Sequence, residues 1–195
     1  MFFMSECKRK KLILFWDSGD TIVEEVTEVR NERGIVTSAK LHEGCTELLL
    51  RLYQEGFRMA LVADGEVESF ENIYRQHELE SVFEVRAVSE ALPERKPAAI
   101  MFQTALDGLG LCAQDKERIV MIGNHLMRDI GGANHFGITS IFFDWTTRYT
   151  KEPQALEEQP DYIAHSAEEL YELIQRLEAE LRGKENYGEP LSENS

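Results

Sequence analysis

Short runs of apolar residues alternate along the chain with longer segments whose apolar positions recur at helical spacing. The first run, Leu12 to Trp16, ends at Asp17 and is followed by turn-forming residues up to Thr21. An apolar run this short, bounded by turn formers, predicts a strand that is buried on both faces. The same criterion predicts further strands at 57–63, 82–88, 119–122, 138–143 and 161–163.

The segments between these runs carry the apolar stripes of amphipathic helices. Helices are predicted at 41–54, 66–77, 100–109, 127–136 and 167–182. This alternation predicts an α/β fold in which a doubly wound, Rossmann-like parallel sheet is covered by helices on both faces. The polar segment 24–40 interrupts the alternation, and we expect it to form a short hairpin rather than a domain.

The chain length bounds the number of domains. A chain of 195 residues suffices for one well-buried domain and leaves little for a second. We therefore expect a single α/β domain over residues 1–183. The residues after Gly183 are polar, so we expect a flexible tail over 184–195.

Charge and cysteine content narrow the partners and the compartment. The formal net charge of −15 makes nucleic acid a poor partner, because its phosphates would be repelled over most of the surface. No apolar run is long enough to cross a bilayer, so no membrane partner is expected, and no signal-peptide cleavage pattern follows the basic N-terminal stretch. Cys7, Cys45 and Cys112 include no CxxC pair, which favours a reducing cytoplasm.

Polar residues that could carry chemistry follow several predicted strands. They are Asp17 to Thr21, Asp64 and Gly65, and Asn124 to Asp129, with Lys96 in a loop between two prolines. The carboxyl ends of parallel strands form the edge at which such sheets bind ligands, so we expect these groups to converge. A phosphate substrate would need local positive charge there, from Lys96 and a metal ion.

Each of these residues also has a simpler interpretation when it is taken alone. Asp17 can hydrogen-bond its own turn, and Lys96 can be a solvated loop lysine. Asn124 can cap a helix, and Asp129 can complement a helix dipole. His125 has no second His or Cys near it and is interpreted as an exposed loop residue.

In their order along the chain, these features resemble the haloacid dehalogenase-like (HAD) hydrolase superfamily. The motifs of that superfamily are a strand followed by D-x-D-x-T, a strand ending in Ser or Thr, a lysine, and a strand followed by an acidic pair. The resemblance spans about residues 11–145. Its most specific part is the tract IVMIGNHLMRDIGGANHFGITSIFFD, residues 119–144.

The resemblance implies a magnesium-dependent phosphatase with an aspartate nucleophile. Asp17 would attack phosphorus, and water would then release phosphate from the resulting aspartyl phosphate. The implied magnesium ligands are Asp17, the backbone carbonyl of Gly19, Asn124 and Asp129. The implied substrate-binding groups are Lys96, Thr21, which orders the nucleophile loop in the family, and the Asp64–Gly65 turn, whose backbone amides hold phosphate in the family.

Three positions depart from the family pattern. Gly19 replaces the second aspartate, the general acid and base, and this could cost on the order of a hundred- to ten-thousandfold in rate unless Asp20 or the substrate compensates. Ala63 replaces a hydroxyl, and Asn124 replaces an acidic metal ligand. A catalytically silent relative that binds or regulates is therefore the alternative function.

Two further features of the resemblance bear on the substrate. Dehalogenation of a small haloacid is a third possible activity, because the dehalogenases of the family also lack the second aspartate. The dehalogenase pattern, however, includes a large lid. The excursion at 24–40, where many members insert a lid, is small here. The lid is thus expected to be small or absent, so that either a larger substrate or a partner subunit would complete the site. The expected substrate is a phosphorylated small molecule or a larger phosphorylated one. Neither the substrate nor the oligomeric state can be predicted from these residues.

Overall fold

Six parallel strands form the central sheet of the computed structural model, which describes residues 11–187. Their order across the sheet is β5-β4-β1-β6-β7-β8, and every neighbouring pair is parallel. The strands are β1 (Ile13–Trp16), β4 (Arg58–Ala63), β5 (Val85–Val88), β6 (Ile119–Gly123), β7 (Thr139–Phe143) and β8 (Tyr162–Ala164). The predicted parallel α/β sheet is confirmed.

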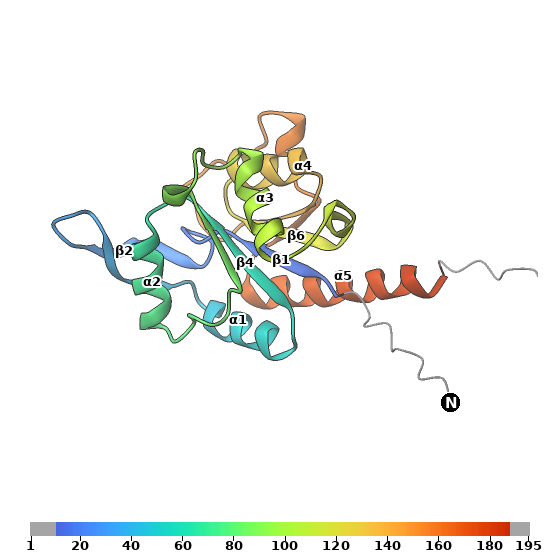
Figure 1. Ribbon diagram of the computed structural model, residues 1–195, viewed down its shortest axis with the longest axis horizontal. Helices are drawn as coiled ribbons and strands as arrows, with labels where there is room; N and C mark the ends of the chain where they lie inside the picture. The colour runs from blue at the N-terminus through green and yellow to red at the C-terminus, as the bar shows by residue number, and fades with distance from the viewer. Residues whose placement is uncertain (1–10, 188–195) are drawn as a thin grey trace, which may run out of the picture.

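Helices cover both faces of the sheet (Figure 1). On one face lie α1 (Cys45–Gln54), α2 (Val67–Gln76) and α5 (Ala167–Tyr187), and on the other lie α3 (Ala99–Gly108) and α4 (Gly131–Phe136). Successive side chains of β1 point to opposite faces, so Leu14 and Trp16 join the first core and Ile13 and Phe15 the second. All four are fully buried, which explains why the strand is apolar at every position.

The predicted hairpin is present and is fastened to α2. Its antiparallel strands are β2 (Val23–Arg30) and β3 (Val36–Leu41), joined by a turn in which Gly34 adopts a φ of 80°. Side chains of α2 satisfy the outer edge of β3: Asn72 Nδ2 donates to the Val36 carbonyl at 3.0 Å, and Ser69 Oγ accepts from its amide at 3.0 Å. The hairpin therefore packs against α2, to one side of the central sheet, and does not lie across it.

The boundaries of α2 and α3 lie within one residue of the predicted ones, whereas three other helical segments differ more from the prediction. The helix predicted at 41–54 begins only at Cys45, because Leu41 pairs with Val23 as the last residue of β3. The helix predicted at 127–136 is a π-helical turn, η3 (Leu126–Ile130), followed by α4. Helix α5 continues through Gly183 to Tyr187, because one helical glycine costs only about 1 kcal/mol.

Of the tail expected over 184–195, residues 184–187 are helical, and residues 188–195 lie outside the described part of the chain. The same holds for Cys7 and most of the basic N-terminal stretch. Three short 3-10 helices complete the fold: η1 (Ser89–Ala91), η2 (Ala113–Arg118) and η4 (Leu156–Glu158).

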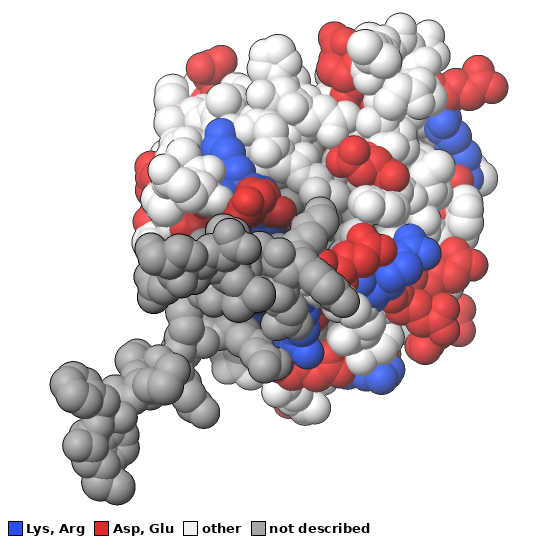
Figure 2. All heavy atoms as spheres, turned by 90° about the vertical axis from the view of Figure 1, so that its right-hand side faces the viewer, with Lys and Arg blue, Asp and Glu red and all other residues white. Residues whose placement is uncertain are grey.

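Between residues 11 and 187, no helix combines the length and the apolar character needed to cross a membrane. On the face drawn in Figure 2, acidic side chains outnumber basic ones among the described residues, and the two kinds are interspersed. That distribution agrees with the formal net charge of −15.

Candidate active site

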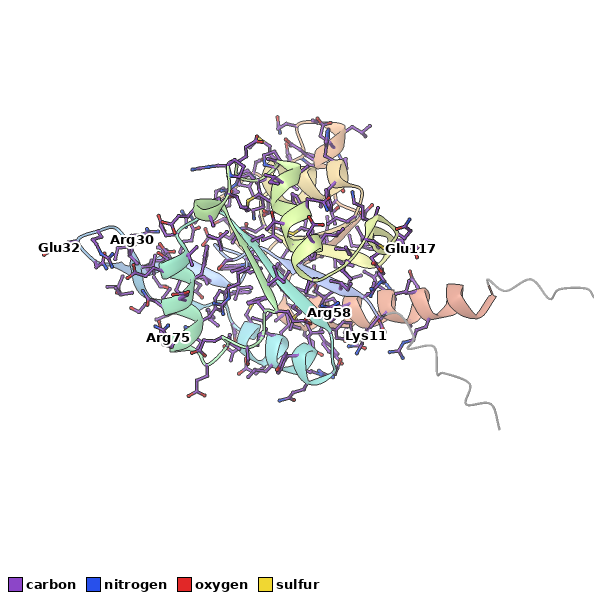
Figure 3. The ribbon with its side chains drawn as sticks, in the orientation of Figure 1. Lys11, Arg30, Glu32, Arg58, Arg75 and Glu117 are labelled. Carbon is purple, nitrogen blue, oxygen red and sulfur yellow. The ribbon has the colours of Figure 1, made fainter. Side chains whose placement is uncertain are left out.

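The predicted site residues lie at the carboxyl edge of the sheet. In Figure 3, Arg30 and Glu32 of the hairpin lie at the left-hand end of the molecule, and Lys11, just before β1, and Arg58, at the start of β4, lie well to the right of them, near the middle. The central strands therefore run toward the hairpin, and the residues that follow them gather there.

Asp17 is the first residue after β1 and is held by a tight turn. Its amide donates to the Ile122 carbonyl at 2.9 Å, which extends the pairing of β1 with β6 by one residue. The Ser18 carbonyl then accepts hydrogen bonds from three successive amides, those of Thr21, Ile22 and Val23. This turn brings Thr21 Oγ1 to 2.7 Å from Asp17 Oδ2, so Thr21 orients the carboxylate.

Lys96 links the two predicted carboxylates. Its ammonium nitrogen lies 2.6 Å from Asp17 Oδ1 and 2.6 Å from Asp129 Oδ1. The three side chains are 1%, 10% and 2% exposed, respectively. Lys96 reaches this position from the loop before α3, far from both aspartates in sequence, and we call Lys96, Asp17 and Asp129 the inner cluster.

Burial and mutual charge set the ionisation of the inner cluster. Burial alone would lower the pKa of Lys96, but the charges of Asp129 and Asp17 outweigh it and raise that pKa above its ordinary value. Burial and the charge of Asp17 raise the pKa of Asp129 to about 6. The lysine thus stays cationic, and it is shared between two carboxylates.

The π-helical turn η3 places Asp129 against the end of β6. Its Oδ2 accepts a hydrogen bond from the His125 amide at 2.9 Å. A Cβ atom on Gly123 would collide with the Asp129 side chain, so the glycine allows this close approach. Such π-helical turns are frequent at functional sites.

Two residues of this segment differ from the simpler interpretations given above. Asp129 is fully buried and bound to Lys96, so complementing a helix dipole is not its main interaction. His125 is half-buried, and its Nδ1 accepts a hydrogen bond from the Arg128 amide. Burial and the neighbouring Arg128 charge lower the pKa of His125.

Asn124 is buried beside the inner cluster without satisfying its own amide. The residue is 2% exposed, and neither Oδ1 nor Nδ2 has a hydrogen-bond partner among the described residues. A buried amide oxygen without a donor is suited to a cation that prefers oxygen ligands, as magnesium does. Asp17, the Gly19 carbonyl, Asn124 and Asp129 could therefore hold magnesium.

Only two of these four ligands are carboxylates. In keeping with this, residues 11–187 contain no group of three or more His, Cys, Asp or Glu side chains arranged to hold a metal ion. The donor set is compatible with magnesium, but it carries less negative charge than a set with an acidic residue at 124.

The Asp64–Gly65 turn after β4 is bound to its surroundings. Asp64 Oδ1 accepts a hydrogen bond from the Lys96 amide at 3.0 Å, and its Oδ2 lies 3.6 Å from Arg128. The Gly65 amide, predicted to bind substrate, donates to Ser89 Oγ at 3.0 Å. Asp64 therefore positions the lysine loop, and the Gly65 amide already has a partner.

A second cluster, which we call the outer cluster, consists of Asp20, Glu25 and Arg148. Arg148 Nη1 lies 2.7 Å from Asp20 Oδ2 and 2.9 Å from Glu25 Oε2. Asp20 Oδ1 also accepts a hydrogen bond from the Glu25 amide at 3.0 Å. Burial raises the pKa of both carboxyl groups, and the charge of Arg148 opposes this shift.

Glu25 also occupies the space next to Gly19. A Cβ atom at residue 19 would collide with Glu25 Oε1 and would lie 3.0 Å from its Cδ. Neither Glu25 nor Arg148 was predicted as a site residue, because Glu25 lies in the hairpin and Arg148 lies after β7. The only signal was indirect: a glycine where the family carries a side chain leaves space for another residue.

A large open cleft adjoins the site. Its volume is about 1160 Å³, and its lining includes Asp64, Gly65, Lys96 and Arg128. A smaller cavity of about 60 Å³ lies between the turn that contains Ser18 and Gly19, the hairpin, and the Asp64–Gly65 turn. The large cleft borders the inner cluster through Lys96, whereas Asp17 and Asp129 are not among its lining residues. Its volume is sufficient for a phosphorylated metabolite.

A family model agrees with this geometry. The model described as haloacid dehalogenase-like hydrolase matches residues 6–143. The chain belongs to this family. The site residues from Asp17 to Asp129 all lie within the matched range, so the predicted membership is confirmed.

Several curated HAD relatives are named phosphatases. A glyceraldehyde 3-phosphate phosphatase from Pyrococcus furiosus is 29% identical over 134 residues, which are 68% of this chain and 54% of that protein. A phosphoglycolate phosphatase from Vibrio parahaemolyticus is 28% identical over 69% of this chain and 56% of its own length. This chain thus spans about half the length of these relatives.

Solved structures show the same fold. An uncharacterized protein from Listeria monocytogenes serotype 4b matches with a TM-score of 0.68 at 20% identity, over 86% of this chain and 99% of that one. The magnesium-bound HAD-hydrolase YfnB from Bacillus subtilis matches with a TM-score of 0.60 at 24% identity, over 69% and 56%.

Proposed function

We propose that this protein is a magnesium-dependent phosphatase that acts on phosphorylated small molecules through an aspartyl-phosphate intermediate. The observation that carries the proposal is the inner cluster, in which Lys96 Nζ lies 2.6 Å from the carboxylates of both Asp17 and Asp129 at the carboxyl edge of the sheet. The relatives named as phosphatases support it. Free thiols at Cys45 and Cys112 are compatible with a cytoplasmic location.

In the proposed reaction Asp17 is the nucleophile. Thr21 binds one carboxylate oxygen and Lys96 the other, so the carboxylate is held in one orientation for attack on phosphorus. Lys96 also offsets the negative charge that a phosphate would bring into a site with two aspartates. Asp129 holds the lysine in place from the other side.

The proposed metal ligands are Asp17, the Gly19 carbonyl, Asn124 and Asp129. When bound, magnesium supplies positive charge between the attacking carboxylate and the phosphate oxygens. The proposed substrate contacts are Lys96 and the Asp64–Gly65 turn, which line the cleft of about 1160 Å³. To bind phosphate, the Gly65 amide would exchange its hydrogen bond to Ser89 Oγ for one to the substrate. Thr21 contributes by ordering the nucleophile loop.

The test is phosphate release from a panel of phosphorylated metabolites, with and without magnesium chloride. We expect hydrolysis that requires magnesium and falls to background in Asp17→Asn, because an amide is not a nucleophile towards phosphorus. Asp107→Asn on the exposed part of α3 is the matched control and should leave turnover unchanged. Magnesium-dependent stabilisation against heat provides a readout of metal binding that does not depend on turnover.

The alternative is a catalytically silent HAD-fold protein. The side chain missing at Gly19, the missing hydroxyl at Ala63 and the neutral amide at Asn124 favour it. If no panel member is hydrolysed while magnesium still stabilises the protein, this alternative replaces the phosphatase proposal.

A further inference from the structure

A phosphate ester with a basic leaving group needs a proton at the bond that breaks. Asp17 cannot supply it while it attacks phosphorus, and Lys96 is held between two carboxylates. The donor must therefore be another group that faces the same space. Gly19, which lies in the turn between Asp17 and Thr21, has no side chain that could donate this proton.

The hairpin delivers a carboxyl group into that space. Glu25 projects from β2 so that its Oε1 lies where the side chain of residue 19 would begin. The carboxylate oxygens of an aspartate at position 19 would lie about as far from the Cβ atom of residue 19 as Glu25 Oε1 does. Gly19, Glu25, Asp64 and Gly65 all line the small cavity of about 60 Å³, so Glu25 shares this space with the turns that follow β1 and β4.

Arg148 fixes Glu25 by one oxygen only. Its guanidinium lies 2.9 Å from Oε2, which leaves Oε1 directed at Gly19. The amide of Glu25 is held by Asp20 Oδ1 at 3.0 Å, so the backbone of β2 is tied to the nucleophile loop. Glu25 is thus held through its backbone amide and through Oε2, and neither of these contacts involves Oε1.

The other titratable groups nearby are already engaged. Asp20 uses both oxygens, one for the Glu25 amide and one for Arg148. Asp64 binds the Lys96 amide and faces Arg128. Glu28 and Glu66, which line the same small cavity, face Arg30. His125 caps the π-helical turn through Nδ1 and is a rival through Nε2.

We infer that Glu25 is the proton-transferring residue of this site and takes the place of the side chain that Gly19 lacks. This inference rests on the proposed phosphatase function. As a carboxylate oxygen of Asp17 bonds to phosphorus, the bond from phosphorus to the ester oxygen breaks and that oxygen receives the Glu25 proton, leaving as an alcohol. Water then attacks phosphorus and gives a proton to Glu25, the bond to Asp17 breaks, and phosphate departs.

Leaving-group dependence tests this role. In Glu25→Gln, kcat/KM for glycerol 2-phosphate, whose leaving group is a basic alkoxide, should fall about 100-fold or more. For 4-nitrophenyl phosphate, whose leaving group needs little protonation, the fall should be less than about tenfold. Glu24→Gln, the adjacent residue on β2, is the control and should change neither value.

A residue swap provides an independent readout. Gly19→Asp alone should lose activity, because its side chain collides with Glu25. Combined with Glu25→Ala, it returns a carboxyl group to the same space, and kcat/KM for glycerol 2-phosphate should rise at least about tenfold above that of Glu25→Ala. A structural role for Glu25 would not produce this rescue.

Several results would overturn the inference. They are equal losses of Glu25→Gln on the two esters, no loss at all, a swap no faster than Glu25→Ala, or the selective loss appearing in His125→Gln instead. In these cases the wild-type enzyme still hydrolyses phosphate esters, and the proposed function stands. Absence of hydrolysis with every ester would overturn both.

Discussion

The inner and outer clusters share one plan: a single cation lies between two carboxylates. In the inner cluster the cation is Lys96 and its side chain is 1% exposed. In the outer cluster the cation is Arg148 and its side chain is 45% exposed. The same charge pattern therefore has two structural effects: in the inner cluster it fixes the carboxylate of Asp17, the proposed nucleophile, and in the outer cluster it ties the hairpin to the turn after β1.

Burial decides how much each ion pair matters. A buried pair that loses one partner leaves an uncompensated charge, whereas an exposed pair is screened by water and salt. Four changes test this contrast, in decreasing order of their expected effect.

Removing the inner cation should have the largest effect. Lys96→Met leaves the buried carboxylates of Asp17 and Asp129 without a cationic partner and should lower the free energy of unfolding by about 3–5 kcal/mol. Chemical denaturation at neutral pH measures it, with Lys40→Met on exposed β3 as the control. A loss below about 1 kcal/mol would show that water reaches the inner cluster after all.

Adding a carboxylate to the inner cluster should have the next largest effect. Asn124→Asp introduces charge at a site that is 2% exposed and, without magnesium, should cost about 2–3 kcal/mol, or roughly two pKa units. Magnesium chloride should then raise the Tm more in this variant than in the wild type, since the added charge strengthens binding. Asn31→Asp in the exposed hairpin turn makes the same charge change and should show no metal response; equal responses would remove Asn124 from the metal site.

Removing the outer cation should cost less stability than removing the inner one. Arg148→Gln breaks the ion pair with Glu25, whose side chain is 32% exposed, and the ion pair with Asp20, whose side chain is only 2% exposed. Because Asp20 keeps its hydrogen bond from the Glu25 amide, the free energy of unfolding should fall by about 1–2 kcal/mol. Denaturation at low and high salt measures it, and the difference from wild type should shrink as salt rises. A cost like that of Lys96→Met would erase the distinction between the clusters.

The smallest effect is expected at the base of the hairpin. His42 stacks on Trp145 with ring centroids 3.8 Å apart, and burial lowers its pKa from 6.5. The unfolded chain then binds protons that the folded protein does not, so stability should fall as the pH drops below about 6.5 through the folded pKa. The Tm of His42→Gln should fall less over this range than that of the wild type; parallel curves would exclude His42 as the cause.

The candidate site was predictable as far as the family pattern reaches. Asp17, Lys96 and Asp129 were predicted from their order after predicted strands, and the structure brings them within hydrogen-bond distance. Their chemical roles stay predictions. Asn124 was predicted as a weakened ligand, but only the structure shows that its amide has no partner.

Sequence alone determined the parallel α/β fold, the hairpin at 24–40 and the turn from Asp17 to Thr21. These features depend on local patterns: apolar runs bounded by turn formers, and apolar stripes at helical spacing. Tertiary structure alone decided that Leu41 pairs in a strand, that a π-helical turn precedes α4, and that Glu25 fills the space beside Gly19. These features depend on how particular side chains and backbone segments pack in three dimensions, and such packing leaves no periodic trace in the sequence.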